Sequence, residues 1–409
     1  MKRTTRGLIF FVVTCLGLCS LEASGPPAAK RPKEFFGIAS GYTLGYVEFW
    51  DAVKSEGKWS SWWENRFQPD IGRMKELDVG WVMWWMRWYE IEPRKGEFQH
   101  LAKVRRVVDE LANHQIEVVM DFHGAPCWAA EQPPDCTEEV NPPTLNRLAD
   151  YQESLRHLVS EFKGKVRNWK ILEEENVMFY GNLPVAERAR QYARVLKAAY
   201  EAVKSVDSSI QVILGGIHVD MFHTPQAKYL KFTKLLVKEL EALSNRPLCD
   251  VLAMHQHRFP YGPYQVNPYT KRTMAQEIDD LLAVFDQSRL YRGKKLWITN
   301  LSWPGVGDRD RVNEGIVSEE TQARFLVQAH EVMNHAKRAH RIERWGWVDL
   351  RDPDFLTEPP EFEWYYGLLR YDRKAGTWVE KPAYRALKNL PRLAVPSAQN
   401  SPFRVRSDN

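Results

Sequence analysis

Eight short apolar runs, separated by longer amphipathic stretches, constrain this chain more than any other feature of its sequence. Each run is five to seven residues long, the length of a buried strand. Strands that alternate with helices form a parallel sheet with the helices packed outside it. The runs are Phe35–Ala39, Val79–Met83, Glu117–Phe122, Val166–Leu172, Gln211–Gly215, Val251–His255, Lys295–Thr299 and Arg344–Val348.

Between the runs, apolar residues recur at helical spacing. Clear stretches are Leu101–His114, Leu145–Phe162, Val185–Ser205, Ala227–Leu243, Ala275–Gln287 and Glu319–Ala336, with weaker ones near Pro69–Leu77 and Pro382–Leu390. Eight repeats over residues 35–392 predict fold class α/β, a single (β/α)8 TIM barrel with long βα loops. A doubly wound open sheet is the alternative. It is disfavoured because neither a GxGxxG nor a Walker loop follows any run.

The N-terminus has the pattern of a targeting signal. Basic residues at positions 2, 3 and 6 precede an apolar run at 7–19 and small residues at 23–25. This order predicts a Sec signal peptide in residues 1–24 and a secreted or periplasmic protein. The apolar run is too short to span a bilayer, which needs about 20 residues. A lipoprotein anchored at Cys19 is the less favoured alternative, because Leu18 is large for that position.

The segments that flank the predicted barrel are polar. The net charge of the chain argues against nucleic acid as a partner. Residues 25–34 are Pro-rich and predict a mobile lead-in, and residues 393–409 predict a polar tail. Lys and Arg total 57 against 53 Asp and Glu, a net charge of +4, which is no nucleic-acid footprint. No segment after the leader is apolar enough to cross a membrane. The sequence predicts no oligomeric state.

Cysteine and histidine usage predicts neither a metal nor another cofactor. Removing the leader leaves Cys127, Cys136 and Cys249, of which the first two could pair across a loop. No Cys or His spacing resembles a metal site. His255 and His257 share one strand face, but two histidines without a third ligand are interpreted as hydrogen-bonding residues.

Three motifs at the ends of the predicted strands carry a family resemblance. They read W..IEP.KG.F from Trp88, P.WA from Pro126, and W.DLRD from Trp347 followed by GLL and KPAY. Together they resemble clan A of the glycoside hydrolases, the (β/α)8 families of β-xylosidases, endoglucanases and β-galactosidases. The likeness spans residues 35–390. It implies a retaining mechanism with two carboxyl groups about 5–5.5 Å apart.

The resemblance places the general acid/base at the end of the fourth strand. Glu174 falls on the glutamate of the family pattern Trp-x-x-x-Asn-Glu-Pro-Asn, and Asn176 is retained. Glu173 replaces the Asn that holds the sugar 2-hydroxyl, and Glu175 replaces the Pro. Strand pleating predicts that Glu173 and Glu175 point one way and Glu174 the other.

The nucleophile position departs from the family. In Ile-Thr-Asn-Leu-Ser-Trp at the seventh strand, Asn300 stands where the family has glutamate. An amide has no anionic oxygen with which to form a glycosyl intermediate. Met83 stands where the family often has the arginine that orients the nucleophile, and Arg87 is an uncertain substitute. The two losses are mutually consistent.

Three explanations of these departures stay open. The chain is a pseudo-glycosidase that binds glycan without cutting it, or it cleaves O-glycosidic bonds by another route, or the register at the seventh strand is different. The second route needs another carboxylate to activate water. Its candidates are Glu173, Asp349, Glu358, Glu361 and Glu363.

Other residues at strand ends fit a sugar cleft, and 16 tryptophans favour a ligand with flat apolar faces. The expected partner is therefore an oligo- or polysaccharide. Trp81 and Trp85 are expected to face helices and Trp84 to point into the barrel. The predicted substrate-binding residues are Trp88, His123, Trp128, Asn176, His255, His257, Trp303 and Trp347.

Overall fold

The computed structural model describes residues 35–40, 47–130, 142–177, 183–219, 227–335, 338, 340–354 and 365–390. The chain divides into a segment of residues 1–31 and a compact unit of residues 32–409. The predicted signal peptide, lead-in and polar tail therefore lie outside the described residues and stay predictions.

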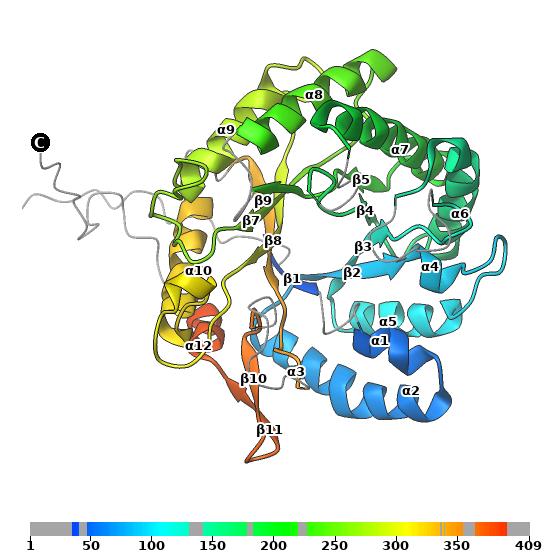
Figure 1. The fold of residues 1–409 in the computed structure, drawn as a ribbon. Coiled ribbons are helices and arrows are strands. Elements are labelled where there is room, and N and C mark those ends of the chain that lie inside the picture. Colours follow the sequence, from blue (N-terminus) through cyan, green and yellow to red (C-terminus); the bar gives the residue numbers. More distant parts are fainter. Residues whose placement is uncertain are drawn as a thin grey trace, which may run out of the picture. The chain divides into compact units, whose positions relative to one another are not determined.

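Nine strands form one sheet with parallel pairing throughout (Figure 1). They are β1 (Phe36–Ser40), β2 (Trp81–Arg87), β3 (Glu117–His123), β4 (Asn168–Ile171), β5 (Gln211–Ile213), β6 (Ile217–Val219), β7 (Leu252–His257), β8 (Leu296–Ser302) and β9 (Ile342–Val348). Each of the eight predicted runs overlaps a strand. The run at Gln211–Gly215 corresponds to β5, and β6 follows after a break of three residues.

The break explains how nine strands close an eight-stranded barrel. β5 pairs with β4, and β6 pairs with β7. A parallel bridge between Ile213 and Val251 joins β5 to the start of β7. β5 and β6 thus form the fifth barrel strand together, and the open-sheet alternative is excluded.

Helices surround the sheet (Figure 1). The eight predicted ones correspond to α3 (Gln68–Glu76), α5 (Leu101–Asn113), α6 (Leu148–Glu161), α7 (Val185–Val206), α8 (Ala227–Leu243), α9 (Met274–Asp286), α10 (Glu319–Asn334) and α12 (Pro382–Asn389). In α5 the residues Val104, Val107, Val108 and Leu111 are buried, which is the spacing of one helical face. A capping box of Thr273 and Gln276 begins α9.

The barrel interior is filled by Trp81. A Cβ atom at Gly37 on β1 or at Gly346 on β9 would collide with this indole. Glycine is therefore required at both positions, on β1 beside β2 and on β9 one strand farther on. The expected orientation of the β2 tryptophans is wrong: Trp84 packs outward against Phe49, with ring centroids 4.7 Å apart. The strand runs from Trp81 to Arg87, so residues 81, 83, 85 and 87 face inward.

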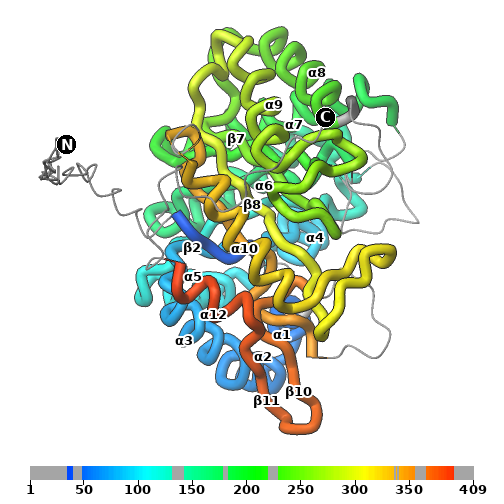
Figure 2. Tube along the Cα trace, turned by 90° about the vertical axis from the view of Figure 1, so that its left-hand side faces the viewer, coloured from blue at the N-terminus to red at the C-terminus, as the bar shows by residue number. Residues whose placement is uncertain are grey.

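Several short elements between the barrel strands and helices were not predicted, most of them after the first and eighth barrel strands. Near the N-terminus these are α1 (Val47–Val53), α2 (Glu56–Trp62) and a π-helical turn (Trp63–Phe67); α4 (Trp88–Ile91) follows β2. Near the C-terminus, β10 (Leu369–Asp372) and β11 (Thr377–Glu380) form an antiparallel hairpin. The hairpin lies beside α12 and close to α3 (Figures 1 and 2). Arg73 of α3 pairs with Glu380 of β11 at 3.0 Å. Two 3-10 turns (Leu145–Arg147 and Val312–Glu314) complete the described elements.

A buried charge cluster, called here the C-terminal clamp, joins these elements after β9. Its members are Glu48, Asp70, Arg351, Asp352 and Lys381. The Arg351 guanidinium contacts Asp70 at 2.9 Å and Glu48 at 3.1 Å, and Lys381 contacts Asp352 at 2.6 Å. The motif residues Arg351, Asp352 and Lys381 therefore hold the C-terminal segment against the barrel.

Two further sequence predictions concern cysteines and membrane spans. Cys127 is disulfide-bonded, and Cys136 lies outside the described residues. Cys249 is a buried free thiol. Among the described helices, none has the length and apolar character needed to traverse a bilayer.

Candidate functional site

The chain leaves β4 through two left-handed residues. Leu172 has φ 61° and Glu174 has φ 46°, a conformation that costs free energy for residues with a Cβ atom. The two turns replace the regular pleat, so Glu173 and Glu174 both reach His255. Glu175 instead points toward the backbone at Gly215. The prediction that Glu173 and Glu175 share one side is therefore wrong.

Glu174 lies among three imidazoles, and we call these four residues the histidine cluster. Its Oε1 is 2.8 Å from His255 Nδ1 and 3.3 Å from His257 Nε2, and its Oε2 is 3.7 Å from His218 Nδ1. Burial alone would raise the pKa of Glu174, but the imidazoles lower it well below its usual value. Glu174 is thus a carboxylate at neutral pH, which can accept a proton but has none to donate.

Glu173 belongs to a second buried chain of polar contacts. Lys170 donates to Glu173 and, at 2.9 Å, to Asp121 on β3. His123 Nδ1 lies 3.4 Å from the other Asp121 oxygen. Burial, reinforced by Asp121, raises the pKa of Glu173 to about 8. On its far side Glu173 Oε1 lies 3.4 Å from His255 Nε2, so one imidazole separates the carboxyl groups of Glu173 and Glu174.

The two residues that follow have supporting positions. Glu175 is fully buried, makes no hydrogen bond to another described residue, and has its pKa raised to about 8 by burial. Asn176 forms two hydrogen bonds with the backbone of His218: its side chain donates to the carbonyl at 2.9 Å and accepts from the N–H at 2.9 Å. Asn176 thus fixes one of the histidines.

Asn300 lies within β8, directly beside His255 of β7 in the strand register. Its side chain is 8% exposed, and its Oδ1 has no hydrogen-bond partner among the described residues. All seven residues of β8 are non-acidic. The strand therefore presents an amide where a retaining glycosidase needs an anionic oxygen.

The second departure also lies on a strand. Met83 is buried on β2 between Ala39 and Val119 in the register. Arg87 lies on the same face but four residues farther along, about 13 Å at the usual rise per residue. It pairs with His123 in the register. Arg87 therefore does not replace a guanidinium at the level of Met83.

The predicted tryptophans are largely enclosed by protein. Trp88, Trp303 and Trp347 are buried, and their indole N–H groups donate to Glu92 and to the carbonyls of residues 261 and 366. Trp128 is half-buried and donates to the carbonyl of residue 92. These contacts account for the indoles by packing, and their role as sugar platforms stays a prediction.

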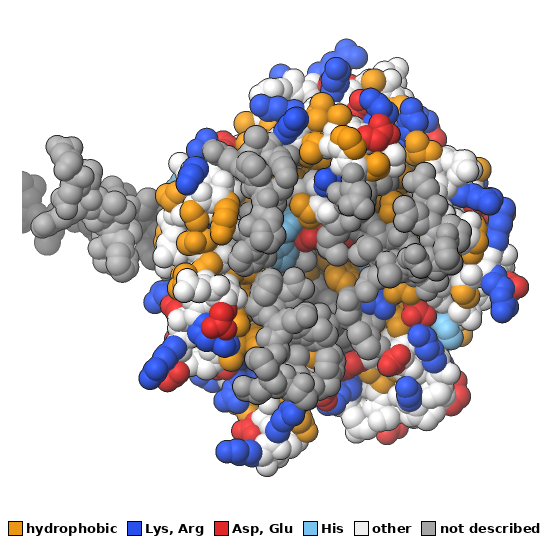
Figure 3. Space-filling view, viewed as in Figure 1, with side chains coloured by type: hydrophobic (Ala, Val, Ile, Leu, Met, Phe, Trp, Pro, Cys, Tyr) orange, Lys and Arg blue, Asp and Glu red, His pale blue; other side chains and the backbone are white. Residues whose placement is uncertain are grey.

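Two residues of the mouth were missed in the sequence. Trp85 is half-buried and stands edge-on to His123, with ring centroids 5.3 Å apart. His218 joins the histidine cluster from β6. Trp85 was missed because the expected second strand ended at Met83, whereas β2 continues to Arg87. His218 was missed because it lies on β6, after the break in the fifth barrel strand. Figure 3 shows histidine and acidic side chains near the centre of the face seen in Figure 1.

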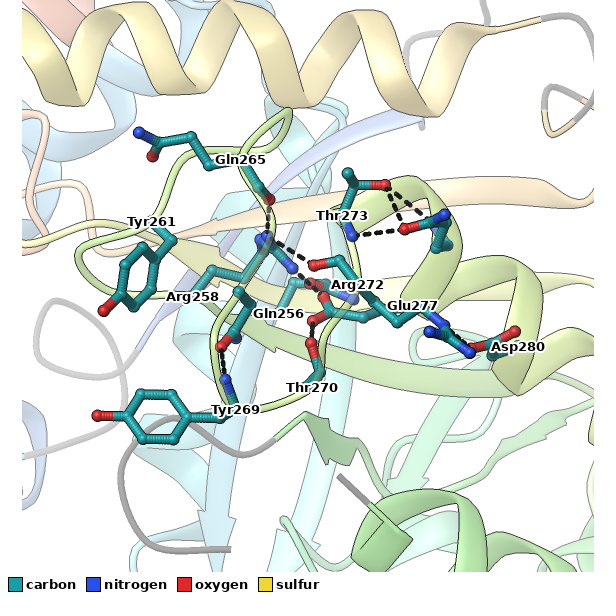
Figure 4. Close-up of polar contacts among 12 residues, drawn as sticks. Gln256, Arg258, Tyr261, Gln265, Tyr269, Thr270, Arg272, Thr273, Glu277 and Asp280 are labelled. Atoms are coloured by element: carbon teal, nitrogen blue, oxygen red, sulfur yellow. Dashed lines mark hydrogen bonds and ion pairs between the residues drawn. The ribbon is translucent and has the colours of Figure 1, made fainter. Parts of the chain in front are cut away.

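The segment after β7 is anchored by Arg258, which is fully buried (Figure 4). Its guanidinium binds Glu277 of α9 and donates to the Gln265 carbonyl at 2.7 Å. Thr270 donates to the same Glu277 carboxylate. These bonds tie both ends of the loop to α9, so the end of β7, with His255 and His257, is rigidly supported.

The alternative carboxylates divide into two groups. Asp349 follows β9, is buried and has φ 62°. Glu358, Glu361 and Glu363 lie outside the described residues.

The histidine cluster also has the composition of a metal site. Ligand atoms of Glu174, His255 and His257 all lie within 4.8 Å of one another. The sequence interpretation counted only two histidines, and the fold supplies a carboxylate from β4 as the third group. The sequence-based argument that His255 and His257 lack a third ligand is therefore wrong, because Glu174 lies beside them.

Comparisons with known proteins agree on the fold. The family Glyco_hydro_42, described as Beta-galactosidase, matches residues 58–182. A family 39 glycoside hydrolase from Bacteroides cellulosilyticus WH2 is similar in structure, with TM-score 0.61, 15% identity and 89% of this chain covered. The chain spans 64% of the length of that enzyme. A search of curated proteins found no match.

Two β-glucosidases are similar over nearly their whole length. The enzyme from Exiguobacterium marinum has TM-score 0.61 at 15% identity, with 88% of this chain and 98% of the other covered. The enzyme from Thermotoga maritima, in complex with cyclophellitol, has TM-score 0.58 at 13% identity, with the same coverage. The resemblance to clan A glycoside hydrolases is therefore confirmed, and the chain has their (β/α)8 fold.

Proposed function

We propose that this protein binds a β-linked oligo- or polysaccharide at the carboxyl ends of its barrel strands and does not cleave it by the retaining route of clan A. The observation that carries the proposal is Asn300, an amide in a strand without any acidic residue. A retaining mechanism requires a carboxylate there to form the glycosyl intermediate.

The surroundings of Glu174 support the same proposal. The carboxylate at the acid/base position is engaged by His255 and His257. An imidazole lies between it and Glu173, so this pair leaves no room for a sugar and a water between two carboxyl groups. Met83 removes the guanidinium that would orient a nucleophile.

Carbohydrate as the ligand is supported by the kind of groups at the strand ends. His123, Trp85 and Arg87 gather at the ends of β2 and β3 and offer hydrogen bonds beside an aromatic face. The similar solved structures are named as glycosidases. The N-terminal pattern supports the further proposal that this binding takes place outside the cytoplasm, in the periplasm or the medium.

Hydrolysis of O-glycosidic bonds by another route is the second candidate. It is favoured by Glu174 at the end of β4 and by Asn176, which keep two positions of the family pattern. In this route Glu174 acts as general acid/base with a water in place of the missing nucleophile.

The test pairs binding with turnover. The mature chain is titrated calorimetrically with β-linked glycans and assayed on aryl glycosides carrying the same sugars, beside Glu174→Gln. We expect binding without turnover, and weaker binding for His123→Ala than for a control change at the end of α5, His114→Gln. Turnover that Glu174→Gln abolishes would establish the second candidate instead.

Asn300→Glu tests the site further. Restoring the carboxylate alone is expected to give no retaining activity, because Met83 and the engaged Glu174 remain. Appearance of retained-configuration product would mean that the pocket is otherwise intact and that Asn300 is the sole lesion.

A further inference from the structure

The histidine cluster brings four potential ligands together from three strands. Glu174 follows β4, His218 lies on β6, and His255 and His257 lie on β7. Two of the three imidazoles face Glu174 Oε1 and the third faces Oε2. Nitrogen ligands from imidazole with one carboxylate suit zinc rather than magnesium or calcium.

The distances fit a single ion. A tetrahedral Zn²⁺ with bonds of about 2.0–2.1 Å places its ligand atoms roughly 3.3 Å apart. Glu174 Oε1 lies 2.8 Å from His255 Nδ1 and 3.3 Å from His257 Nε2, and ligand atoms of the three residues all lie within 4.8 Å of one another. His218 Nδ1 lies 3.7 Å from the other oxygen, Glu174 Oε2. The rings of His218 and His257 meet at 80° and those of His255 and His257 at 77°, so the rings converge without stacking.

The outer contacts match those of metal-bound histidines. A ligand imidazole usually donates its other N–H to a carboxylate or a carbonyl. His255 presents Nδ1 to Glu174. Its Nε2 lies 3.4 Å from Glu173 Oε1, within ion-pair distance but without a hydrogen bond, so a small rotation of either side chain would make this outer contact. Lys170 in turn holds Glu173. The backbone of His218 is fixed by the Asn176 amide.

The backbone is shaped to hold this arrangement. Glu174 adopts a left-handed conformation, and glycine at 216 leaves room for the His255 ring, because a Cβ atom there would collide with it. Glu174 and His257 are 8% and 7% exposed, so the cluster keeps one edge open.

We propose that Glu174, His255 and His257 bind one Zn²⁺ ion at the mouth of the barrel, with a water molecule as fourth ligand. Glu173 is a positioning residue that orients His255. This site is independent of the carbohydrate-binding proposal, because it is defined by the protein's own ligands and needs no sugar.

The test uses untagged mature protein stripped with a chelator. Zn²⁺ is titrated calorimetrically, and Co²⁺ is added separately to read the coordination from its visible absorption. We expect one equivalent of either metal and an intense four-coordinate Co²⁺ spectrum. His255→Gln and His257→Gln should each weaken Zn²⁺ binding at least tenfold, and Glu173→Gln should weaken it 10- to 100-fold at unchanged stoichiometry.

The matched control is His114→Gln, which removes a histidine that also faces a glutamate, Glu110, at 3.3 Å on α5. It should bind Zn²⁺ like the wild type. Substoichiometric binding by the wild type, or binding that His255→Gln and His257→Gln leave unchanged, would overturn the proposal. The Co²⁺ spectrum of the unmodified protein decides the matter even where a variant fails to fold.

Discussion

The C-terminal clamp and the histidine cluster both bury carboxylates after a barrel strand, but they neutralise them differently. In the clamp, Arg351 contacts both Asp70 and Glu48. Burial opposes the charge of Arg351, yet these two carboxylates raise the pKa of the guanidinium further above its usual value. In the histidine cluster, Glu174 has only imidazoles, and burial lowers the pKa of His255.

The difference separates a structural role from a binding role. The clamp contains its own permanent cations, and the carboxylates it buries are compensated within the fold. The histidine cluster places a carboxylate among imidazoles and keeps an edge that is 7–8% exposed. In our proposal a Zn²⁺ ion completes its charge. The predictions below test this contrast, in order of decreasing effect.

Removing the guanidinium should have the largest effect. Arg351→Met leaves the buried Asp70 and the half-buried Glu48 without the guanidinium that pairs with both, which should cost about 3–5 kcal/mol of unfolding free energy. Urea denaturation measures it. The control Arg94→Met breaks an exposed pair with Glu97 and should change the free energy by less than about 0.5 kcal/mol. If both variants lost the same unfolding free energy, the ion pairs of the clamp would be no more stabilising than an exposed surface pair.

Zinc should stabilise the folded chain through the histidine cluster. At a concentration 100 times its dissociation constant, Zn²⁺ should add about 2.7 kcal/mol to the unfolding free energy. In His257→Gln, a tenfold loss of affinity should reduce this increment to about 1.4 kcal/mol or less, while the metal-free protein unfolds almost as the wild type does. Melting curves with and without Zn²⁺ check it. If metal-free His257→Gln lost much of its unfolding free energy, the histidine cluster would have a structural role like that of the clamp.

The clamp should respond to pH through Asp352. Burial raises its pKa to about 7 despite Lys381, against 3.8 for the free side chain. The folded state holds this proton more tightly, so stability falls as pH rises toward and through 7. The loss between pH 5 and 8 is roughly 2.6 kcal/mol. The double change Asp352→Asn with Lys381→Met should flatten this dependence, whereas parallel denaturation curves would contradict the assignment.

A buried group outside both clusters should show no response. Burial raises the pKa of the Cys249 thiol to about 12. The thiolate is the reactive form, so we expect no labelling by an aromatic disulfide reagent in the native protein and full labelling in denaturant. Rapid labelling of the native protein would contradict this, because it would show that the segment between α8 and β7, which contains Cys249, opens to solvent.

The fold was predictable because its signals are local. Helical periodicity gave α8 with the same bounds, Ala227–Leu243, that the structure has. The motif residues Arg351, Asp352 and Lys381 belong to the family pattern, and in the structure they form the ion pairs of the clamp. The orientation of Trp81 was missed because residues 81–86 are all apolar, so no alternation of apolar and polar residues marks the face that turns into the barrel.

The site was less predictable because it depends on non-local contacts. The left-handed residues Leu172 and Glu174 overturn the pleat that sequence reasoning assumed. Asn300 and Met83 could be recognised as departures from a family pattern. The meeting of Glu174 with His218 requires the closed barrel, since β4 and β6 are separated by a long helix in the chain.

The glycine at position 216 gives the histidine cluster a signature that can be searched for. Because His255 occupies the space where a Cβ atom would lie, the two residues cannot vary independently. Any barrel of this kind that carries the His-x-His pair should have glycine at the corresponding place in its fifth strand. A bulkier residue there should appear only where the first histidine has been lost. This pairing distinguishes chains that share the cluster from those that share only the barrel.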